Sequence, residues 1–447
     1  MSNQPQNKMG YMPINKLLIS MSLPVMFSML VQAMYNIVDS IFVSMINENA
    51  LTAVSLAFPF QNLMIAVSSG TCVGINAMLS RCLGAREHDR ANKCANVGLF
   101  LIILSYIAFF FLGLFGSRLF FRAQTDITEI VDYGTIYMQI CAMASFGIFG
   151  QIFFERLLLS TGKTVYSMIS QVSGAVINMI LDPIFIFGWL GLPAMGVAGA
   201  AIATVIGQII AMFVGLWLNI RYNKEIKLNV KDVKPDAEYV KEIYKVGAPT
   251  AIMMSIGSVM TFCLNKILIS FTATATAVFG VYFKLQSFVF MPVFGLNNGM
   301  IPIIAYNYGA KNKERVMKTI KLSAAYAISI MFVGFALFQI LPAQLLGFFN
   351  ASEQMLSIGI PALRCISYSF LFAGFCIVCG SVFQALGNGV YTLIMSFMRQ
   401  IIVLLPSAFL LSLTGNVDNV WFAFPIAETA CMMATIVLMR KILKEKF

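Results

Sequence analysis

One aspartate in the first long apolar stretch of the chain has polar neighbours at helical spacing. Asp39 lies three residues after Asn36, four after Tyr35 and seven after Gln32, so a helix would place these side chains on one face. An ionised group at the centre of an apolar span costs about 2.5–3.5 kcal/mol, and such residues mark proton or ion pathways. A purely structural polar contact is the alternative. We interpret Asp39 as a functional residue.

A second aspartate stands in the fifth apolar stretch. Asp182 follows Asn178 by four residues on the same helical face, and Pro183 directly after it frees a backbone carbonyl nearby. Such a break within lipid is tolerated where it lines a cavity. If Asp39 and Asp182 share one desolvated pocket, we expect them to bind protons as a unit. The sixth stretch adds two polar residues on one face, Thr204 and Gln208.

The composition requires lipid around the helices that carry these residues. Of the 447 residues 59% are hydrophobic and 11% are charged, against about 25% charged in soluble domains. A bilayer core of about 30 Å needs about 20 helical residues per crossing. We predict an all-α polytopic membrane protein with twelve transmembrane helices, the first of them a retained helix rather than a signal peptide. The expected spans are 14–45, 51–80, 94–116, 131–157, 165–188, 197–220, 242–270, 277–306, 316–341, 355–382, 391–413 and 420–440.

Basic residues predict the orientation of the chain in the membrane. With the N-terminus in the cytoplasm, most of the 30 Lys and Arg residues lie at the inner face, and only Arg118 and Arg122 lie outside. Both termini are then cytoplasmic. Basic loops at an anionic leaflet explain the net charge of +11 without any nucleic-acid partner.

The chain repeats itself at an offset of 225 residues. Six spans in each copy give the two copies the same orientation, and parallel repeats in a membrane chain usually place a substrate path between them. We predict a first lobe over residues 1–220 with helices 1–6, a cytoplasmic linker over 221–241 and a second lobe over 242–447 with helices 7–12. The matched pairs include Gly70 with Gly295, Gly74 with Gly299, Gly84 with Gly309, Pro24 with Pro249 and Gln61 with Gln286.

The two copies differ in their charged residues. At the same offset Asp39 meets Leu264 and Asp182 meets Ser407, and Glu428 in the last span is the sole embedded acid of the second copy. We therefore expect one ion-coupling site, in the first copy. The embedded cations of the second copy are Lys266, Lys284, Arg364 and, at a span edge, Arg399. The two lysines either extend to lipid headgroups or face a cavity.

No arrangement of residues in the sequence indicates an enzyme. The one histidine, His88, lies in a polar loop without metal-ligand neighbours, and the sequence has no phosphate-binding glycine loop. Cys376-x-x-Cys379 falls in an apolar stretch without His or acidic partners, which favours packing. We expect no catalytic residue, no cofactor and no dedicated metal, with an ion gradient in place of ATP as the energy source.

In combination these features resemble the multidrug and toxic compound extrusion (MATE) family. The resemblance covers nearly the whole chain, and the order and spacing of its short motifs make the set specific. The motifs are Ser22-Leu-Pro24, Tyr35-Asn-Ile-Val-Asp39, Gly84-Ala-Arg86 and Asn178-x-x-x-Asp182-Pro183. The segments Ser160-Thr-Gly-Lys-Thr164 and Phe294-Gly-Leu-Asn-Asn-Gly-Met300 look closest to the MepA-like bacterial group, near the DinF branch.

The resemblance implies a V-shaped monomer of two pseudo-symmetric six-helix lobes, embedded among the lipids of a bacterial inner (plasma) membrane. Family members export cationic lipophilic drugs, antibiotics and other xenobiotics among them, against proton or sodium entry. The family pattern places the cation site at Asp39, Asn178, Asp182 and Thr204, with sodium as the alternative ion at the first three, and a hinge at Pro24. The acidic residues of a second branch on spans seven, eight and ten are missing from the sequence. Candidates for the substrate cavity are Gln32, Tyr35, Asn36, Gln61, Gln208, Lys284 and Glu428.

We therefore predict a secondary active multidrug efflux antiporter that works by alternating access. Ion binding from outside would neutralise the pocket, repack the first lobe and release the drug outward. A flippase for lipids or polysaccharide precursors is the alternative, and it requires Lys266, Lys284, Arg364 and Arg399 to line one cationic pocket. A role as a membrane scaffold or a receptor would not explain the embedded carboxylates.

Overall fold

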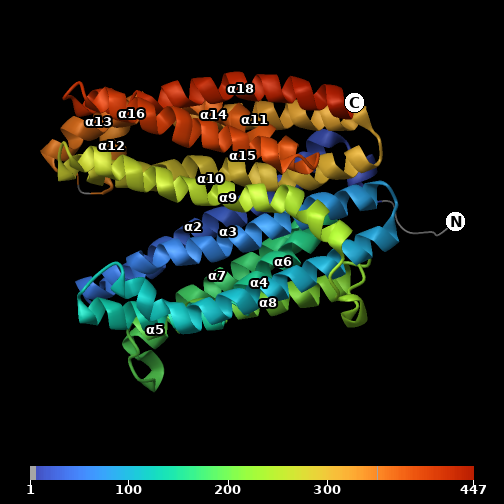
Figure 1. Ribbon diagram of the computed structural model, residues 1–447, viewed down its shortest axis with the longest axis horizontal. Helices are drawn as coiled ribbons and strands as arrows, with labels where there is room; N and C mark the ends of the chain where they lie inside the picture. The colour runs from blue at the N-terminus through green and yellow to red at the C-terminus, as the bar shows by residue number, and fades with distance from the viewer. Residues whose placement is uncertain (1–6, 350) are drawn as a thin grey trace.

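The chain forms a bundle of long helices in this computed structural model, which describes residues 7–349 and 351–447 (Figure 1). Within these ranges ten helices are long and apolar enough to cross a membrane, and no strand occurs. Two further pairs of helices pass the same test jointly, which gives twelve spans if each pair is one bent span. The prediction of an all-α polytopic membrane protein is confirmed.

The first half of the chain supplies the spans that carry both aspartates. Local signals set their ends: Asn47 caps α3, because its side chain accepts a hydrogen bond from the Ala50 N–H at 2.6 Å. The spans are α2 (Ile14–Ser44), α3 (Glu48–Gly84), α4 (His88–Arg122), the pair α5 (Thr128–Met143) and α6 (Phe146–Ser160), α7 (Thr164–Phe187) and α8 (Val197–Tyr222). Two short elements accompany them, α1 (Lys8–Tyr11) and the 3-10 turn η1 (Trp189–Gly191).

The second half repeats this order of spans with local differences. The eleventh span of the chain contains a π-helical segment, η3 (Met398–Leu404), between α15 (Gly389–Phe397) and α16 (Leu405–Ser412). The other elements are η2 (Val230–Asp232), α9 (Ala237–Ile269), α10 (Ala273–Gly309), α11 (Lys313–Ile340), α12 (Pro342–Gly347), the pair α13 (Glu353–Ser367) and α14 (Phe370–Ala385), α17 (Val417–Val420) and α18 (Ala423–Lys446). Thus α9 begins inside the stretch 221–241 that the sequence suggested as a linker.

Helix boundaries recur at the offset found in the sequence. The helices α4 and α11, α5 and α13, and α7 and α15 each begin 225 residues apart. The sequence predicted continuous helices over 131–157 and 355–382, whereas both spans are bent, by 44° between α5 and α6 and by 50° between α13 and α14. Since the same bend occurs at equivalent positions, it belongs to the repeated fold and not to a local accident of sequence.

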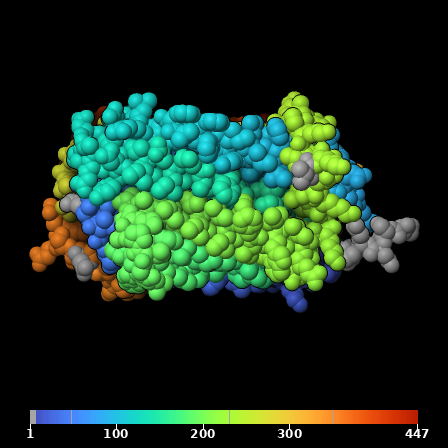
Figure 2. Space-filling model, turned by 90° about the horizontal axis from the view of Figure 1, so that it is seen from below, coloured from blue at the N-terminus to red at the C-terminus, as the bar shows by residue number. Residues whose placement is uncertain are grey.

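Large apolar side chains cover the outer face of the first half. Figure 2 looks onto this face, where α4 and α5 form the upper part and α7 and α8 the lower part. On α4 the side chain of Phe115 is 76% exposed, and on α8 that of Ile220 is 75% exposed. Such a surface is unfavourable in water and favourable in hydrocarbon, as the composition predicted.

Closely packed glycines join the two halves at the end of the bundle where both termini lie (Figure 1). Here α3 packs against α9 and α10 packs against α2. A Cβ atom added to Gly74 would lie 2.2 Å from the Ile243 carbonyl oxygen, and one added to Gly299 would lie 2.6 Å from Ser22 Oγ. Thus two glycines matched by the 225-residue offset both permit contact between backbones of opposite halves, which explains why both copies have glycine there.

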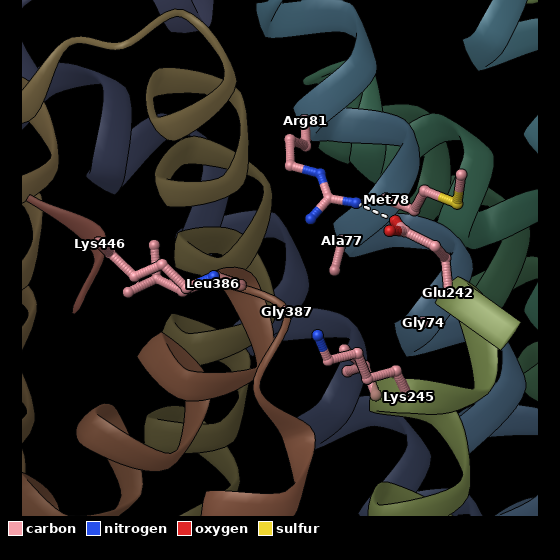
Figure 3. A pocket seen from close by; sticks show the side chains of 11 residues that line it. Gly74, Ala77, Met78, Arg81, Glu242, Lys245, Leu386, Gly387 and Lys446 are labelled. Carbon is pink, nitrogen blue, oxygen red and sulfur yellow. Dashed lines mark hydrogen bonds and ion pairs between the residues drawn. The ribbon is translucent and has the colours of Figure 1, made fainter. Parts of the chain in front are cut away.

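Ion pairs surround the start of α9 at the same end. Arg81 of α3 pairs with Glu242, Lys93 Nζ of α4 lies 2.6 Å from Asp236 Oδ2, and Arg90 lies 3.8 Å from Glu238. Figure 3 shows the Arg81–Glu242 pair at the wall of a small cavity of about 30 Å³, which Lys245, Gly387 and Lys446 also line. The charged side chains therefore bridge the two halves where the glycines bring their backbones together.

The Lys93–Asp236 pair yields a prediction for pH dependence. The hydrogen bond from Lys93 lowers the pKa of Asp236 below its ordinary 3.8, and the same bond raises the pKa of Lys93 above 10.5. Stability from Asp236 is present above its ordinary pKa and is lost as pH falls through the lowered pKa, while that from Lys93 is lost only as pH rises through the raised one. The pair therefore contributes a constant amount between about pH 5 and 9.

Melting temperatures of the wild type and of Lys93→Gln, measured in detergent across this range, test the prediction. We expect their difference to stay constant from about pH 5 to 9 and to shrink at either extreme. A difference that changes between pH 5 and 8 would contradict the assignment of these pKa shifts to this contact.

Candidate functional site

Three polar residues of the first half form one buried hydrogen-bonded group. Asn178 and Asp182 come from α7 and Thr204 from α8, and their side chains are at most 6% exposed. The amide orientation that satisfies both neighbours has Asn178 donating to Asp182 Oδ2 at 3.3 Å and accepting from the Thr204 hydroxyl at 3.3 Å and its N–H at 3.0 Å. Asn178 and Asp182 therefore lie on one face of α7, as their four-residue spacing predicted, and Thr204 of α8 completes the hydrogen-bonded group.

Asp39 of α2 faces this group. Its carboxylate interacts electrostatically with Asp182, and the Tyr35 phenol one turn earlier interacts with both aspartates. The buried Asp39 Oδ1 has no hydrogen-bond partner in the described part of the chain. A desolvated oxygen without a partner is expensive, so it points to a proton or a cation that this pocket would hold.

Two residues of α5 that the sequence did not single out extend the pocket. Tyr137 and Cys141 are buried, lie one turn apart and interact electrostatically with Asp39. The candidate Gln61 of α3 donates to the Tyr137 hydroxyl at 3.1 Å. Their spacing, Tyr-x-x-x-Cys, places both residues on one face of the helix. Because neither carries a charge and both are common in apolar spans, this spacing alone did not mark them as site residues.

The remaining first-half candidates differ in their burial and in their contacts. Gln171 of α7 donates to Gln32 of α2, which connects these helices one to two turns from Asp39. The Gln208 side chain, one turn after Thr204, is half-buried, and that of Asn36 is exposed. Of the predicted cavity residues in this half, Tyr35, Gln32 and Gln61 thus interact with the two aspartates or with the helices that carry and surround them. The side chains of Asn36 and Gln208 make no hydrogen bond to this group within the described ranges.

Pro24 lies within α2, the helix that carries Asp39. A proline cannot donate to the carbonyl four residues earlier, which here belongs to Ser20. The Thr164 hydroxyl at the start of α7 donates to this carbonyl at 3.2 Å instead. The position predicted as a hinge therefore has its released backbone acceptor satisfied from a neighbouring helix, while α2 remains one helix from Ile14 to Ser44.

Charged candidates of the second half lie apart from this pocket. Glu428 of α18 is buried, and its Oε2 lies 3.5 Å from Arg399 of η3. Lys284 is exposed with its Nζ 5.8 Å from the Phe349 ring, and Lys266 is exposed with its Nζ 5.1 Å from the Phe262 ring. Because Glu428 neutralises Arg399, the cationic pocket that a flippase would require lacks one of its four charges.

The geometry defines a class of protein before any comparison: a duplicated, multi-span membrane protein with paired carboxylates among the helices of one half. The sequence model of the MatE family matches residues 24–184 and 249–410, two segments that begin 225 residues apart. The chain belongs to the MatE family of membrane transporters, so it is a transporter and not an enzyme.

Individual relatives agree with this assignment over nearly the full length. The chain is 28% identical to the multidrug export protein MepA of Staphylococcus haemolyticus over 424 residues, which cover 94% of this chain and 91% of MepA. It is 25% identical to MepA of Staphylococcus aureus, with 95% and 93% covered. Its fold matches the crystal structure of a MATE protein in complex with MaL6 with a TM-score of 0.92 at 25% identity, covering 99% of each chain. The resemblance to a MepA-like MATE transporter is confirmed.

Proposed function

We propose that this chain is a secondary active antiporter of a bacterial plasma membrane that exports cationic lipophilic drugs in exchange for protons, with sodium as the alternative ion. The observation that carries the proposal is the buried hydrogen-bonded group of Asn178, Asp182 and Thr204, with the carboxylate of Asp39 from a third helix in electrostatic interaction with Asp182. Two carboxylates with amide and hydroxyl oxygens can hold a proton or a sodium ion. Relatives named multidrug export proteins support the substrate class.

The two copies of the fold act as lobes in the proposed cycle, residues 1–220 and 242–447. With both termini in the cytoplasm, the contacts between α3 and α9 and between α2 and α10 would close the inner end. Ion binding at Asp39 and Asp182 would neutralise the pocket and alter the packing of α2 against α7. Because Pro24 lies in α2 between the pocket and the closed end, we assign it the hinge role.

The energetics of the exchange are adequate. A membrane potential of 100 mV supplies about 2.3 kcal/mol per elementary charge that moves inward. If two ions enter for each monovalent drug that leaves, one net charge moves inward per cycle, which corresponds to roughly fortyfold accumulation of substrate at 1.4 kcal/mol per factor of ten. The 29 Met and 39 Phe residues of the chain supply adaptable apolar surface for drugs of different shape, although most of them pack in the core or face lipid.

Ethidium transport by the purified protein in liposomes tests the proposed function. Proton and sodium gradients are imposed separately, each with the membrane potential clamped. We expect one of the two gradients to drive ethidium uphill and to fail in the presence of an ionophore for that ion. If ethidium movement depends on neither the proton nor the sodium gradient, the antiport proposal is wrong.

A further inference from the structure

Two cysteines and a carboxylate converge inside the second half, away from the pocket of the first. Cys376 comes from α14, and Glu428 and Cys431 come from α18. One ligand atom from each lies within 4.8 Å of the other two, and the side chains are 2%, 6% and 1% exposed. Among the residues that the structure describes, this is the one group of three or more acidic, cysteine or histidine ligands. The sequence suggested packing for Cys376 and no acidic partner, but Glu428 lies next to it.

The polar atoms of this group are incompletely satisfied. Glu428 uses Oε2 toward Arg399 at 3.5 Å, while its buried Oε1 has no hydrogen-bond partner in the described ranges. Both thiols have a long hydrogen bond with the Thr435 hydroxyl, one turn after Cys431: this hydroxyl donates to Cys376 Sγ at 3.8 Å and lies 3.9 Å from Cys431 Sγ. The carboxylate oxygen Oε1 is thus the unsatisfied atom of the group. Packing alone does not require a buried carboxylate oxygen and two thiols at one point, so the arrangement calls for a ligand.

The ligand types select a thiophilic divalent cation. Thiolates bind Zn²⁺ at about 2.3 Å and carboxylate oxygens at about 2.0–2.2 Å, so ligand atoms already within 4.8 Å of each other need only small side-chain rotations. Soft sulfur ligands favour zinc and cadmium over magnesium, calcium or sodium. Glu428 and Cys431 are three residues apart on one face of α18, and Cys376 closes the site from α14.

We propose that Cys376, Glu428 and Cys431 form a binding site for a thiophilic divalent cation within the second lobe. On binding, each thiol loses its proton to solvent and each sulfur donates a lone pair to the metal, so one M²⁺ replaces two H⁺. Two thiolates, one carboxylate, the Arg399 guanidinium and M²⁺ sum to no net charge. The buried site is therefore as neutral with the metal as with both thiols protonated, and occupancy fixes α14 against α18.

This inference is independent of the proposed antiport, since it shares no residue with the first-half pocket. Cd²⁺ titration of the purified full-length protein in detergent tests it, with sulfur-to-cadmium charge-transfer absorption in the ultraviolet as the signal and a pH indicator for released protons. We expect one Cd²⁺ bound per chain with two protons released. The signal should be lost in Cys376→Ser and in Cys431→Ser and retained in Cys72→Ser, a buried control in the first half.

A second measurement uses the unaltered chain and so does not depend on whether a variant folds. Mass spectrometry after maleimide labelling in a mild denaturant series should show that Cd²⁺ protects Cys376 and Cys431 selectively and leaves Cys72 unprotected. Absence of charge-transfer absorption in the wild type, or equal absorption in Cys376→Ser and Cys431→Ser, would overturn the proposal. So would protection of all cysteines alike.

Discussion

Exchange of Asp182 for Asn is expected to abolish ion-coupled drug export while the protein stays folded. Asn keeps the size of the side chain and its hydrogen bond with Asn178, but it cannot alternate between a charged and a neutral state. With two ions exchanged for each ethidium cation, accumulation driven by a 100 mV potential should fall from roughly fortyfold to none. Asp39→Asn should behave in the same way, because the two carboxylates interact within one pocket.

A matched control variant, assayed in the same vesicles, shows whether the loss of accumulation is specific to the two aspartates of the pocket. Asp132→Asn alters an exposed aspartate of α5, 3.8 Å from Arg118 at its surface, and should retain wild-type accumulation. Melting temperature and detergent gel filtration check that all variants fold. Wild-type coupling in Asp39→Asn and Asp182→Asn would remove the basis for a coupling site in the first half.

Exchange of Gly74 for Ala is expected to disrupt the closed end of the bundle. The added methyl group would lie 2.2 Å from the Ile243 carbonyl oxygen, a backbone atom that cannot rotate away. Overpacking of this kind costs about 1–3 kcal/mol, which shifts the balance between closed and separated halves by about five- to 150-fold. We expect a lower melting temperature and faster hydrogen exchange at the start of α9. Gly299→Ala should give a similar result at the α10–α2 contact.

Gly280 provides the control on the same helix as Gly299. No atom lies within 4 Å of a Cβ built at Gly280, so Gly280→Ala should be neutral or should stabilise α10 by up to about 1 kcal/mol. If Gly74→Ala and Gly299→Ala melt at the same temperature as Gly280→Ala, the matched glycines do not determine the contact between the halves.

The sequence predicted the fold, and it drew attention to Asp39 and Asp182 as the proposed coupling residues, because both leave strong local signals. Apolar stretches of about 20 residues indicate helical spans, and a carboxylate such as Asp39 or Asp182 stands out within them. The 225-residue offset placed equivalent helices, and α4 and α11 begin at that separation. These signals depend on residue type and spacing alone.

Features that depend on contacts between distant segments could not be predicted from the sequence. Tyr137 and Cys141 come within electrostatic range of Asp39 only because α5 packs against α3, α4 and α8, and neither residue is unusual in an apolar helix. The bends at α5–α6 and α13–α14 are not marked by a proline at the break. Likewise, the partner of Cys376 is not Cys379 on its own helix but Cys431, 55 positions away on α18.

The most direct test of the central claim follows the coupling ion while a drug moves. Proteoliposomes loaded with ethidium are diluted into drug-free buffer, and lumenal pH and entry of radioactive sodium are recorded in parallel as ethidium leaves. We expect the wild type to take up one of these two ions in exchange for ethidium, and Asp39→Asn and Asp182→Asn to take up neither. Exchange of either ion at the wild-type rate by both variants would contradict the account.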